Sequence, residues 1–148
     1  MTCGKEPRNP LCEPCSEIII GSMRPEVHNW FKQAEADLRS SRNSREAGDY
    51  YMSVFASQQA AEKSLKALNL FKLKEYPKGH SIIYLAQRVE APESMMSAIR
   101  DLNPEYMSTR YPDMAVGVPA ELYDDKIAAR HFKTAQEVVA WVREQMRE

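Results

Sequence analysis

YYMSVFASQQAAEKSLKAL, residues 50–68, is the most regular stretch of the chain. Its apolar side chains recur every three or four residues, which is the spacing of one face of an α-helix. The sequence therefore predicts a long helix that buries this face and continues to about Phe71. The expected buried face carries Tyr51, Val54, Phe55, Gln58, Ala61, Leu65 and Leu68, and the expected water-exposed face carries Glu62, Lys63 and Lys66.

The residues before this stretch predict a second long helix. Pro25 followed by Glu26 is typical of a helix start, and the apolar residues that follow keep the helical spacing. Gly48 can adopt the left-handed conformation that ends a helix, and Asp49 offers an oxygen that can cap the next one. We expect two antiparallel helices joined by a tight turn.

The residues after it predict shorter elements. Ser81 can cap one short helix, and Pro92 can start another. Residues 104–119 lose the helical period and contain Pro112 and Gly117, so they are expected to form one long loop. Long loops inside compact domains are often functional.

A final helix is predicted to start at Glu121, where acidic residues suit the positive end of the helix dipole. The expected fold class is therefore all-α, an up-and-down bundle of four to five helices. We expect residues 23–148 to form this bundle as one domain, which suits a chain of 148 residues.

Composition narrows the class of function. The formal net charge is −1, so any contact with nucleic acid must come from a local patch and not from a basic surface as a whole. The longest aliphatic run, residues 18–20, is far shorter than the ~20 residues of a membrane span. A cytoplasmic location is the expectation.

Residues 1–22 differ from the rest, because prolines interrupt them and no period is sustained. We expect a flexible extension that is dispensable for folding, or a start upstream of a natural first residue at Met23. All three cysteines, Cys3, Cys12 and Cys15, lie here and cannot cross-link the helical body. A zinc site on these thiolates is the alternative, although a fourth ligand is lacking unless His28 supplies it.

The chain resembles the HEPN family of nucleotide- and RNA-associated proteins over about residues 26–145. The strongest likeness is the helix at residues 50–68, with its aromatic start, QQAAEK and KAL. The other matching elements, in order, are Ala36-Asp37-Leu38, Gly79-His80-Ser81, Thr109-Arg110-Tyr111-Pro112-Asp113 and Val138-Val139-Ala140-Trp141-Val142.

This resemblance implies a helical bundle that commonly forms a homodimer and is often encoded beside a minimal nucleotidyltransferase. In many branches it implies a toxin-like RNase that works without a metal or other cofactor. The family's RNase motif is an arginine followed by histidine after four to six residues, and no histidine of this chain has an arginine at that distance. Arg24 and His28 come nearest, with three residues between them.

Arg110 is the leading candidate for a functional residue, because a guanidinium matches phosphate oxygens and stays charged. Metal-free RNA cleavage needs an acid–base group and a cation, which Arg110 with Tyr111, Asp113 and either His80 or His131 would supply. The structural alternative is an ion pair between Arg110 and Asp113 that holds the loop.

Other polar residues have structural explanations beside functional ones. His80 precedes the helix-capping Ser81, and His131 lies on the apolar stripe of the last helix, where a hydrogen-bonded core or interface histidine is expected. Gln58 is expected to bond across the bundle or a dimer interface. Lys63 and Lys66 are candidate phosphate-binding residues or parts of a solvated face.

Two functions follow. The first is a nucleotide- or RNA-binding protein, with RNase activity as its catalytic form and Arg110 in its site. The second is a non-catalytic helical partner of a minimal nucleotidyltransferase, which the missing arginine–histidine spacing favours. We also expect a homodimer, because Tyr50, Tyr51 and Trp141 add aromatic surface to the bundle.

Overall fold

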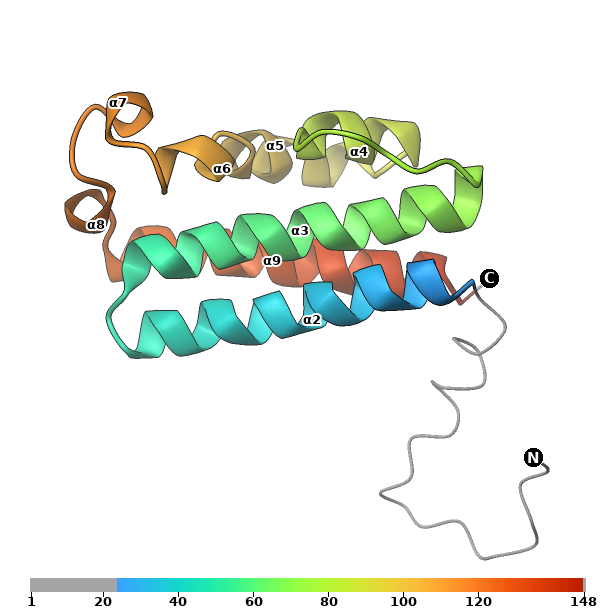
Figure 1. The fold of residues 1–148 in the computed structure, drawn as a ribbon, viewed down its shortest axis with the longest axis horizontal. Coiled ribbons are helices and arrows are strands. Elements are labelled where there is room, and N and C mark those ends of the chain that lie inside the picture. Colours follow the sequence, from blue (N-terminus) through green and yellow to red (C-terminus); the bar gives the residue numbers. More distant parts are fainter. Residues whose placement is uncertain (1–23, 148) are drawn as a thin grey trace, which may run out of the picture.

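The computed structural model describes residues 24–147, and all the regular structure in this range is helical. The elements are α2 (Pro25–Glu46), α3 (Tyr50–Leu73), α4 (Ile82–Arg88), α5 (Glu93–Leu102), α6 (Glu105–Ser108), α7 (Pro112–Ala115), α8 (Pro119–Leu122) and α9 (Asp125–Gln145). The helices α2, α3 and α9 run the length of the molecule, and α4 to α6 return along it as a row of short helices (Figure 1). The predicted all-α, up-and-down bundle is confirmed.

The turn between α2 and α3 forms where the sequence predicts it. Gly48 has a φ of +84°, a conformation that glycine adopts at little cost. Asp49 occupies the N-cap position of α3, but its side chain makes no capping hydrogen bond. Its backbone carbonyl accepts a hydrogen bond from the Ser53 N–H at 3.0 Å. The turn therefore depends on backbone geometry and not on the expected side-chain cap.

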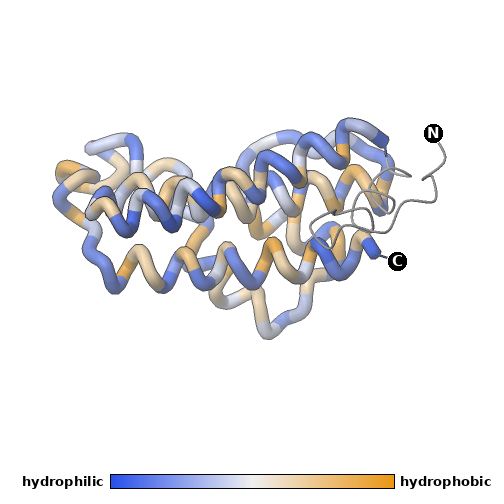
Figure 2. The backbone as a smooth tube through the Cα atoms, turned by 90° about the horizontal axis from the view of Figure 1, so that it is seen from below, coloured by the Kyte–Doolittle hydropathy of each residue, from blue (hydrophilic) through white to orange (hydrophobic). Residues whose placement is uncertain are grey.

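The core lies where α3 packs against α2 and α9, with α4 and α5 closing one side. Apolar and polar residues alternate along the long helices, so each helix buries one face (Figure 2). The largest apolar side chains with at most 1% exposure are Val27, Val54, Leu65, Leu68, Ile82, Leu85, Ile99, Leu102, Val138, Val139 and Val142. Their burial is the main source of stability.

The segment from residue 104 to residue 124 differs from its prediction. It contains three helices of four residues each: α6 and α7 lie where one irregular loop was expected over residues 104–119, and α8 overlaps the predicted start of the last helix. The last helix begins at Asp125 and not at Glu121, because Tyr123 has an extended backbone with φ −116° and ψ +144°. Asp124 caps α9 by accepting a hydrogen bond from the Ile127 N–H.

Within residues 24–147, no helix combines the length and the hydrophobicity that crossing a membrane requires. The predicted extension at residues 1–22 and the alternative zinc ligands Cys3, Cys12 and Cys15 lie outside the described residues.

Candidate functional site

A buried carboxylate, that of Glu62 on α3, is the centre of the candidate site. Its Oε2 accepts hydrogen bonds from Gln58 Nε2 at 3.1 Å and from Gln59 Nε2 at 3.3 Å. Its Oε1 lies 3.0 Å from Lys66 Nζ and 2.8 Å from His80 Nδ1. A buried charge is costly unless partners of this kind surround it, so the four neighbours account for its place inside the bundle.

The sequence prediction that Glu62 and Lys66 face water is wrong. Glu62 is 3% exposed and Lys66 is 7% exposed, whereas Lys63 is partly exposed and pairs with Asp37 of α2 at 2.6 Å. Positions 58, 62 and 66 are one helical turn apart and lie on one face of α3. Gln58 is buried as predicted, but it bonds to Glu62 of its own helix and not across the bundle.

His80 reaches Glu62 from the loop between α3 and α4. The loop is fixed on the far side of His80, where the Ile82 N–H donates to Asn103 Oδ1 at 2.9 Å and the Ser81 hydroxyl caps α4. Because Nδ1 donates to the carboxylate, the neutral ring keeps its lone pair on Nε2. The side chain is 50% exposed, so this histidine can exchange a proton with a bound molecule.

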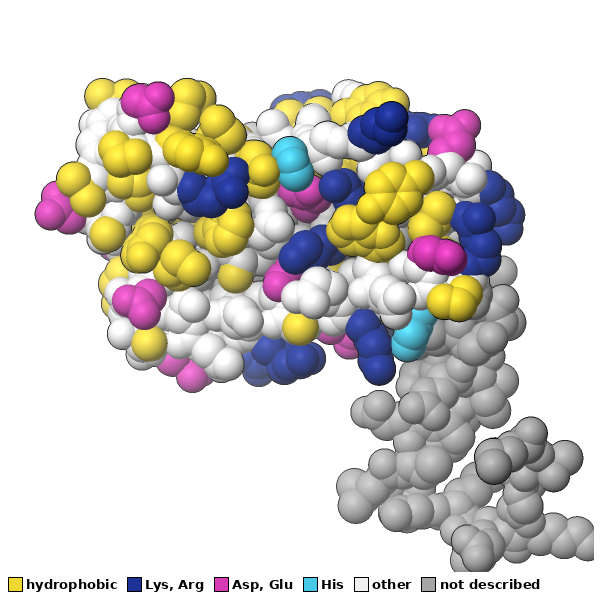
Figure 3. Space-filling view, in the orientation of Figure 1, with side chains coloured by type: hydrophobic (Ala, Val, Ile, Leu, Met, Phe, Trp, Pro, Cys, Tyr) yellow, Lys and Arg dark blue, Asp and Glu magenta, His cyan; other side chains and the backbone are white. Residues whose placement is uncertain are grey.

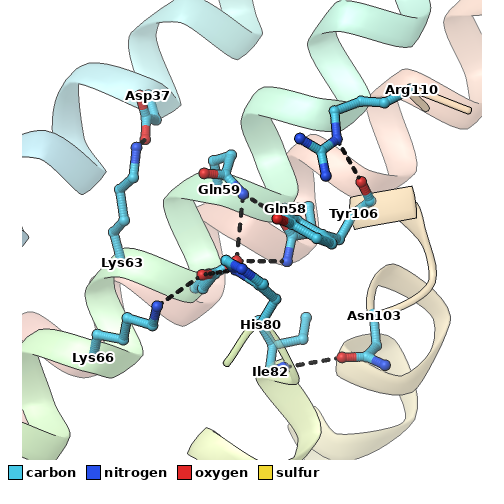
Figure 4. Close-up of polar contacts among 11 residues, drawn as sticks. Asp37, Gln58, Gln59, Lys63, Lys66, His80, Ile82, Asn103, Tyr106 and Arg110 are labelled. Carbon is cyan, nitrogen blue, oxygen red and sulfur yellow. Dashed lines mark hydrogen bonds and ion pairs between the residues drawn. The ribbon is translucent and has the colours of Figure 1, made fainter. Parts of the chain in front are cut away.

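An aromatic ring and a guanidinium complete the site (Figure 4). The Tyr106 ring of α6 stacks on the His80 ring, with centroids 4.0 Å apart and planes 13° from parallel. Arg110 Cζ lies 4.2 Å from the centroid of Tyr106, and its Nε donates to the Tyr106 carbonyl oxygen at 2.9 Å. The phenol ring lies between the imidazole and the guanidinium in Figure 4.

Arg110 is exposed and surrounded by rings. Its Cζ lies 5.1 Å from the Tyr111 centroid and 5.3 Å from the Phe55 centroid. Among the described residues no ion pair joins Arg110 to Asp113 or to another carboxylate. The structural alternative, an ion pair between Arg110 and Asp113 that holds the loop, is therefore wrong. With Nε bonded to Tyr106, the two terminal nitrogens of the guanidinium still offer N–H donors to an anion, because ring faces accept no conventional hydrogen bond from them.

The structure thus brings three of the predicted residues together, namely His80, Arg110 and Lys66. Tyr111 lies beside Arg110, and Lys63 lies one residue from Glu62 on α3, while Asp113 is exposed on α7 and contacts none of them by a hydrogen bond or ion pair. Sequence reasoning missed Glu62 and Tyr106. The signal for Glu62 was an acid within a run of apolar residues, one turn from both Gln58 and Lys66.

The third histidine of the chain, His131 on α9, lies apart in the core. It is fully buried, and neither ring nitrogen has a hydrogen-bond partner. The nearest carboxylates are Asp101, 3.8 Å from Nδ1, and Glu105, 3.7 Å from Nε2. Burial lowers the pKa of His131 to about 4, so at neutral pH it is an uncharged core residue.

A partly buried pair lies next to His131. The Tyr123 hydroxyl donates to Glu105 Oε2, and burial together with this bond raises the pKa of Tyr123. Burial also raises the pKa of Glu105, which the bond from Tyr123 partly offsets. This group ties the segment before α9 to α6 and has a structural role.

The His80 site offers three chemical functions within a few ångströms. The Nε2 atom of His80 can accept or donate a proton, and the Glu62 carboxylate fixes the orientation of the ring. Arg110 can bind the oxygens of a phosphate, and the Tyr106 ring, which contacts both His80 and Arg110, holds the two side chains close together. These are the groups that binding and metal-free cleavage of a phosphodiester require.

Comparisons with known proteins agree on the family. The HEPN domain family model matches residues 27–145. The crystal structure of TT1696 from Thermus thermophilus is similar, with a TM-score of 0.77 and 36% sequence identity over 82% of this chain and 99% of that chain. The structure of ST0689, an archaeal HEPN homologue, has a TM-score of 0.73 and 35% identity over 83% of this chain and 99% of that chain.

A comparison with curated proteins gave no match. The family match nevertheless covers most of the chain, and both structural relatives are matched over nearly their whole length. The chain belongs to the HEPN domain family.

Proposed function

We propose that this HEPN protein binds nucleotide or RNA at the His80 site, with Arg110 on the phosphate and His80 as the acid–base group. One observation carries the proposal. A half-exposed histidine is oriented by a buried carboxylate and stacked on a tyrosine that also contacts an arginine without an acidic partner among the described residues. A core histidine or a loop anchor would not need this combination.

The catalytic form of the proposal is cleavage of RNA without a metal. His80 Nε2 removes the proton of a ribose 2′-hydroxyl, and the 2′-oxygen attacks the adjacent phosphorus. The bond to the 5′-oxygen breaks, and that oxygen takes up a proton from water to leave as the hydroxyl, while the protonated His80 returns its proton to the solvent. Arg110 stabilises the extra negative charge on the phosphate oxygens. The products are a 2′,3′-cyclic phosphate and a 5′-hydroxyl.

This arrangement departs from the family's RNase motif. The arginine follows the histidine by 30 positions, from His80 to Arg110, and the two meet through Tyr106 and not through a short segment of chain. Because the family's catalytic motif is missing, the site supports binding of RNA more directly than it supports cleavage. Binding and cleavage are therefore tested separately.

Binding is tested with Arg110→Ala and Arg110→Lys. A charge-assisted hydrogen bond contributes about 1.5–3 kcal/mol, so Arg110→Ala is expected to weaken nucleotide or RNA binding by about 10- to 150-fold. Arg110→Lys keeps the charge but loses the planar fork, and an intermediate loss is expected. Arg100→Ala on α5 is the control. Arg100 is also an exposed arginine, and its ion pair with Glu93 is exposed and long, at 3.5 Å. Unchanged affinity in folded Arg110→Ala would place the site elsewhere.

Cleavage is tested by incubating labelled RNA with the protein, with and without a chelator. Removal of an acid–base group typically slows a reaction by about 100- to 10,000-fold, which is the expected effect of His80→Ala. His131→Met is the matched control and should cleave at the original rate. RNA that is bound but not cleaved by the unmodified protein would limit the function to binding.

The second candidate function is a partner role, as a homodimer or as a helical partner of a minimal nucleotidyltransferase. The observation in its favour is exposed apolar surface on and beside α7 and α8, at Met114, Val116, Val118 and Leu122. Exposed apolar patches often mark protein interfaces. Light scattering should give about twice 17.0 kDa for a homodimer. Copurification with a nucleotidyltransferase, without RNA binding, would support the partner role instead.

A further inference from the structure

A second aromatic pair lies beside the His80 site. The rings of Trp30 on α2 and Tyr76 in the α3–α4 loop have centroids 5.9 Å apart and planes at 58°. Tyr76 is 62% exposed. The two rings, with Glu26, Asn29 and Gln33, line a shallow hollow of about 320 Å³. This is an open wedge of aromatic faces with amide and carboxylate groups at its rim.

Lys66 connects this hollow to the His80 site. Its Nζ lies 5.2 Å from the Trp30 ring centroid and 3.0 Å from Glu62 Oε1. Lys66 itself is buried and paired, so it joins the two places without offering a free cation. Figure 3 shows hydrophobic, basic and histidine side chains alternating across this face of the molecule.

The α3–α4 loop supplies the spacing between the two aromatic places. Tyr76 and His80 are four residues apart, so their Cα atoms are separated by at most about 14 Å. Pro77 is buried and anchors the loop, whereas Lys78, between them, is exposed. Within residues 24–147 no ion pair engages Lys78. Lys78 therefore puts an exposed cation on the segment that joins Tyr76 to His80.

We propose that the Trp30–Tyr76 hollow is a base-binding subsite, so that the protein binds single-stranded RNA across this hollow and the His80 site and not a lone nucleotide. This inference rests on the proposed function of the His80 site. Bases stack on aromatic faces while a cation contacts the backbone between them, which is how strands are held without a duplex. Glu26 repels phosphate, so the hollow takes the base.

The chemistry of the rim selects among bases. Glu26 can accept a hydrogen bond from an exocyclic amino group, such as that of cytosine. The side-chain amide of Asn29 can pair with a donor or an acceptor, and Gln33 offers its carbonyl oxygen, because its Nε2 donates to Asp37. Uracil lacks an exocyclic amino group. An oligonucleotide of cytosine should therefore bind more tightly than one of uracil.

The test compares CMP with a cytidine oligonucleotide of about eight nucleotides, using the full chain. Stacking of one base contributes enough that Tyr76→Ala should weaken oligonucleotide binding by roughly 5- to 150-fold, with CMP binding unchanged. Tyr84→Ala is the control, because Tyr84 is also an exposed tyrosine and its ring contacts Arg88 instead. The control should leave both affinities unchanged.

A second variant tests the proposed phosphate contact without altering the Tyr76 ring. Lys78→Ala should weaken the oligonucleotide and lower the slope of log affinity against log salt by about one. A duplex of the same length should bind more weakly than the single strand, because its bases are already stacked.

Failure of the inference and failure of the proposed function are distinguishable. If the unmodified protein binds CMP and Tyr76→Ala loses nothing on the oligonucleotide, the second subsite is refuted and the His80 site stands. Equal losses for CMP and the oligonucleotide would also refute it, since Tyr76 would then support the His80 site only. If the unmodified protein binds neither ligand, both proposals fail.

Discussion

His80 and His131 each lie near carboxylates, yet their surroundings give them opposite properties. His80 is half exposed and donates to Glu62 at 2.8 Å, whereas His131 is fully buried with its nearest carboxylate oxygens 3.7 and 3.8 Å away. The first carboxylate is itself buried and fixed by other residues. The second histidine is itself buried, and this loss of solvation opposes its protonation more than the nearby Asp101 favours it.

The difference shows that proximity to an acid does not make a histidine functional. A histidine with one nitrogen fixed and the other free can transfer a proton to or from a ligand. A histidine with both nitrogens buried and without partners contributes volume to the core. Three experiments sharpen this comparison, in order of expected effect.

The largest effect is expected from Glu62→Ala. Removing the carboxylate leaves the Lys66 ammonium buried without its partner, which costs about 3–5 kcal/mol of unfolding free energy. Denaturation with urea measures it. Asp37→Ala is the control, because the Lys63–Asp37 pair is more exposed and should contribute only about 0–1 kcal/mol. Equal losses of unfolding free energy in the two variants would mean that the buried Glu62 cluster stabilises the fold no more than the partly exposed Lys63–Asp37 pair.

The second effect is the acid sensitivity that His131 confers. Its pKa falls from 6.5 in the unfolded chain to about 4 in the fold, so the unfolded state binds more protons between these values. Stability from this residue is complete above pH 6.5 and is lost as the pH falls to about 4, by about 3 kcal/mol in total. The raised pKa of Glu105 works in the opposite direction and offsets part of the loss.

His131→Met removes this titration. Urea denaturation measures the unfolding free energy between pH 7 and pH 4, a range that contains both pKa values of His131. This free energy should fall less steeply with decreasing pH in His131→Met than in the unmodified protein. A loss that stays the same in His131→Met would assign acid sensitivity to other groups.

The smallest effect concerns the loop that presents His80. Asn103→Ala removes the acceptor of the Ile82 N–H and should cost about 1 kcal/mol, as loss of a helix cap does. Asp124→Ala removes the cap of α9 and should cost a similar amount. Only Asn103→Ala should also weaken RNA binding, measured by fluorescence anisotropy. Weaker binding in both variants would point to general destabilisation.

Sequence patterns predicted the long helices because each repeats its apolar spacing over five or more turns. Pro25 and Gly48 marked their ends through local backbone conformation, whereas Asp49 marked the start of α3 without forming the expected side-chain cap. The helices α6 to α8 were missed because four residues form one turn, which is too short to display a period. Boundaries set by a single extended residue, such as Tyr123, leave no pattern either.

The candidate site was only partly predictable for a related reason. Arg110 and His80 were identified by residue type and by the family resemblance. Their meeting depends on Tyr106 and on a buried Glu62 that lies 18 positions before His80. Contacts between distant positions come from the packing of helices, and one sequence does not reveal them. The polar residues at positions 58, 62 and 66 were a signal of the buried cluster. They lie on the buried side of α3, whereas polar residues of a solvated face would lie on the opposite side.

The place of Trp30 gives the molecule an optical probe of its own. The chain has two tryptophans, and Trp30 lines the hollow with Tyr76 while Trp141 packs against the core from α9. In a Trp141→Phe variant the whole indole emission would come from Trp30. Its intensity and wavelength would then report any change next to Lys66, whose ammonium lies 5.2 Å from the ring, in an unlabelled protein and in real time.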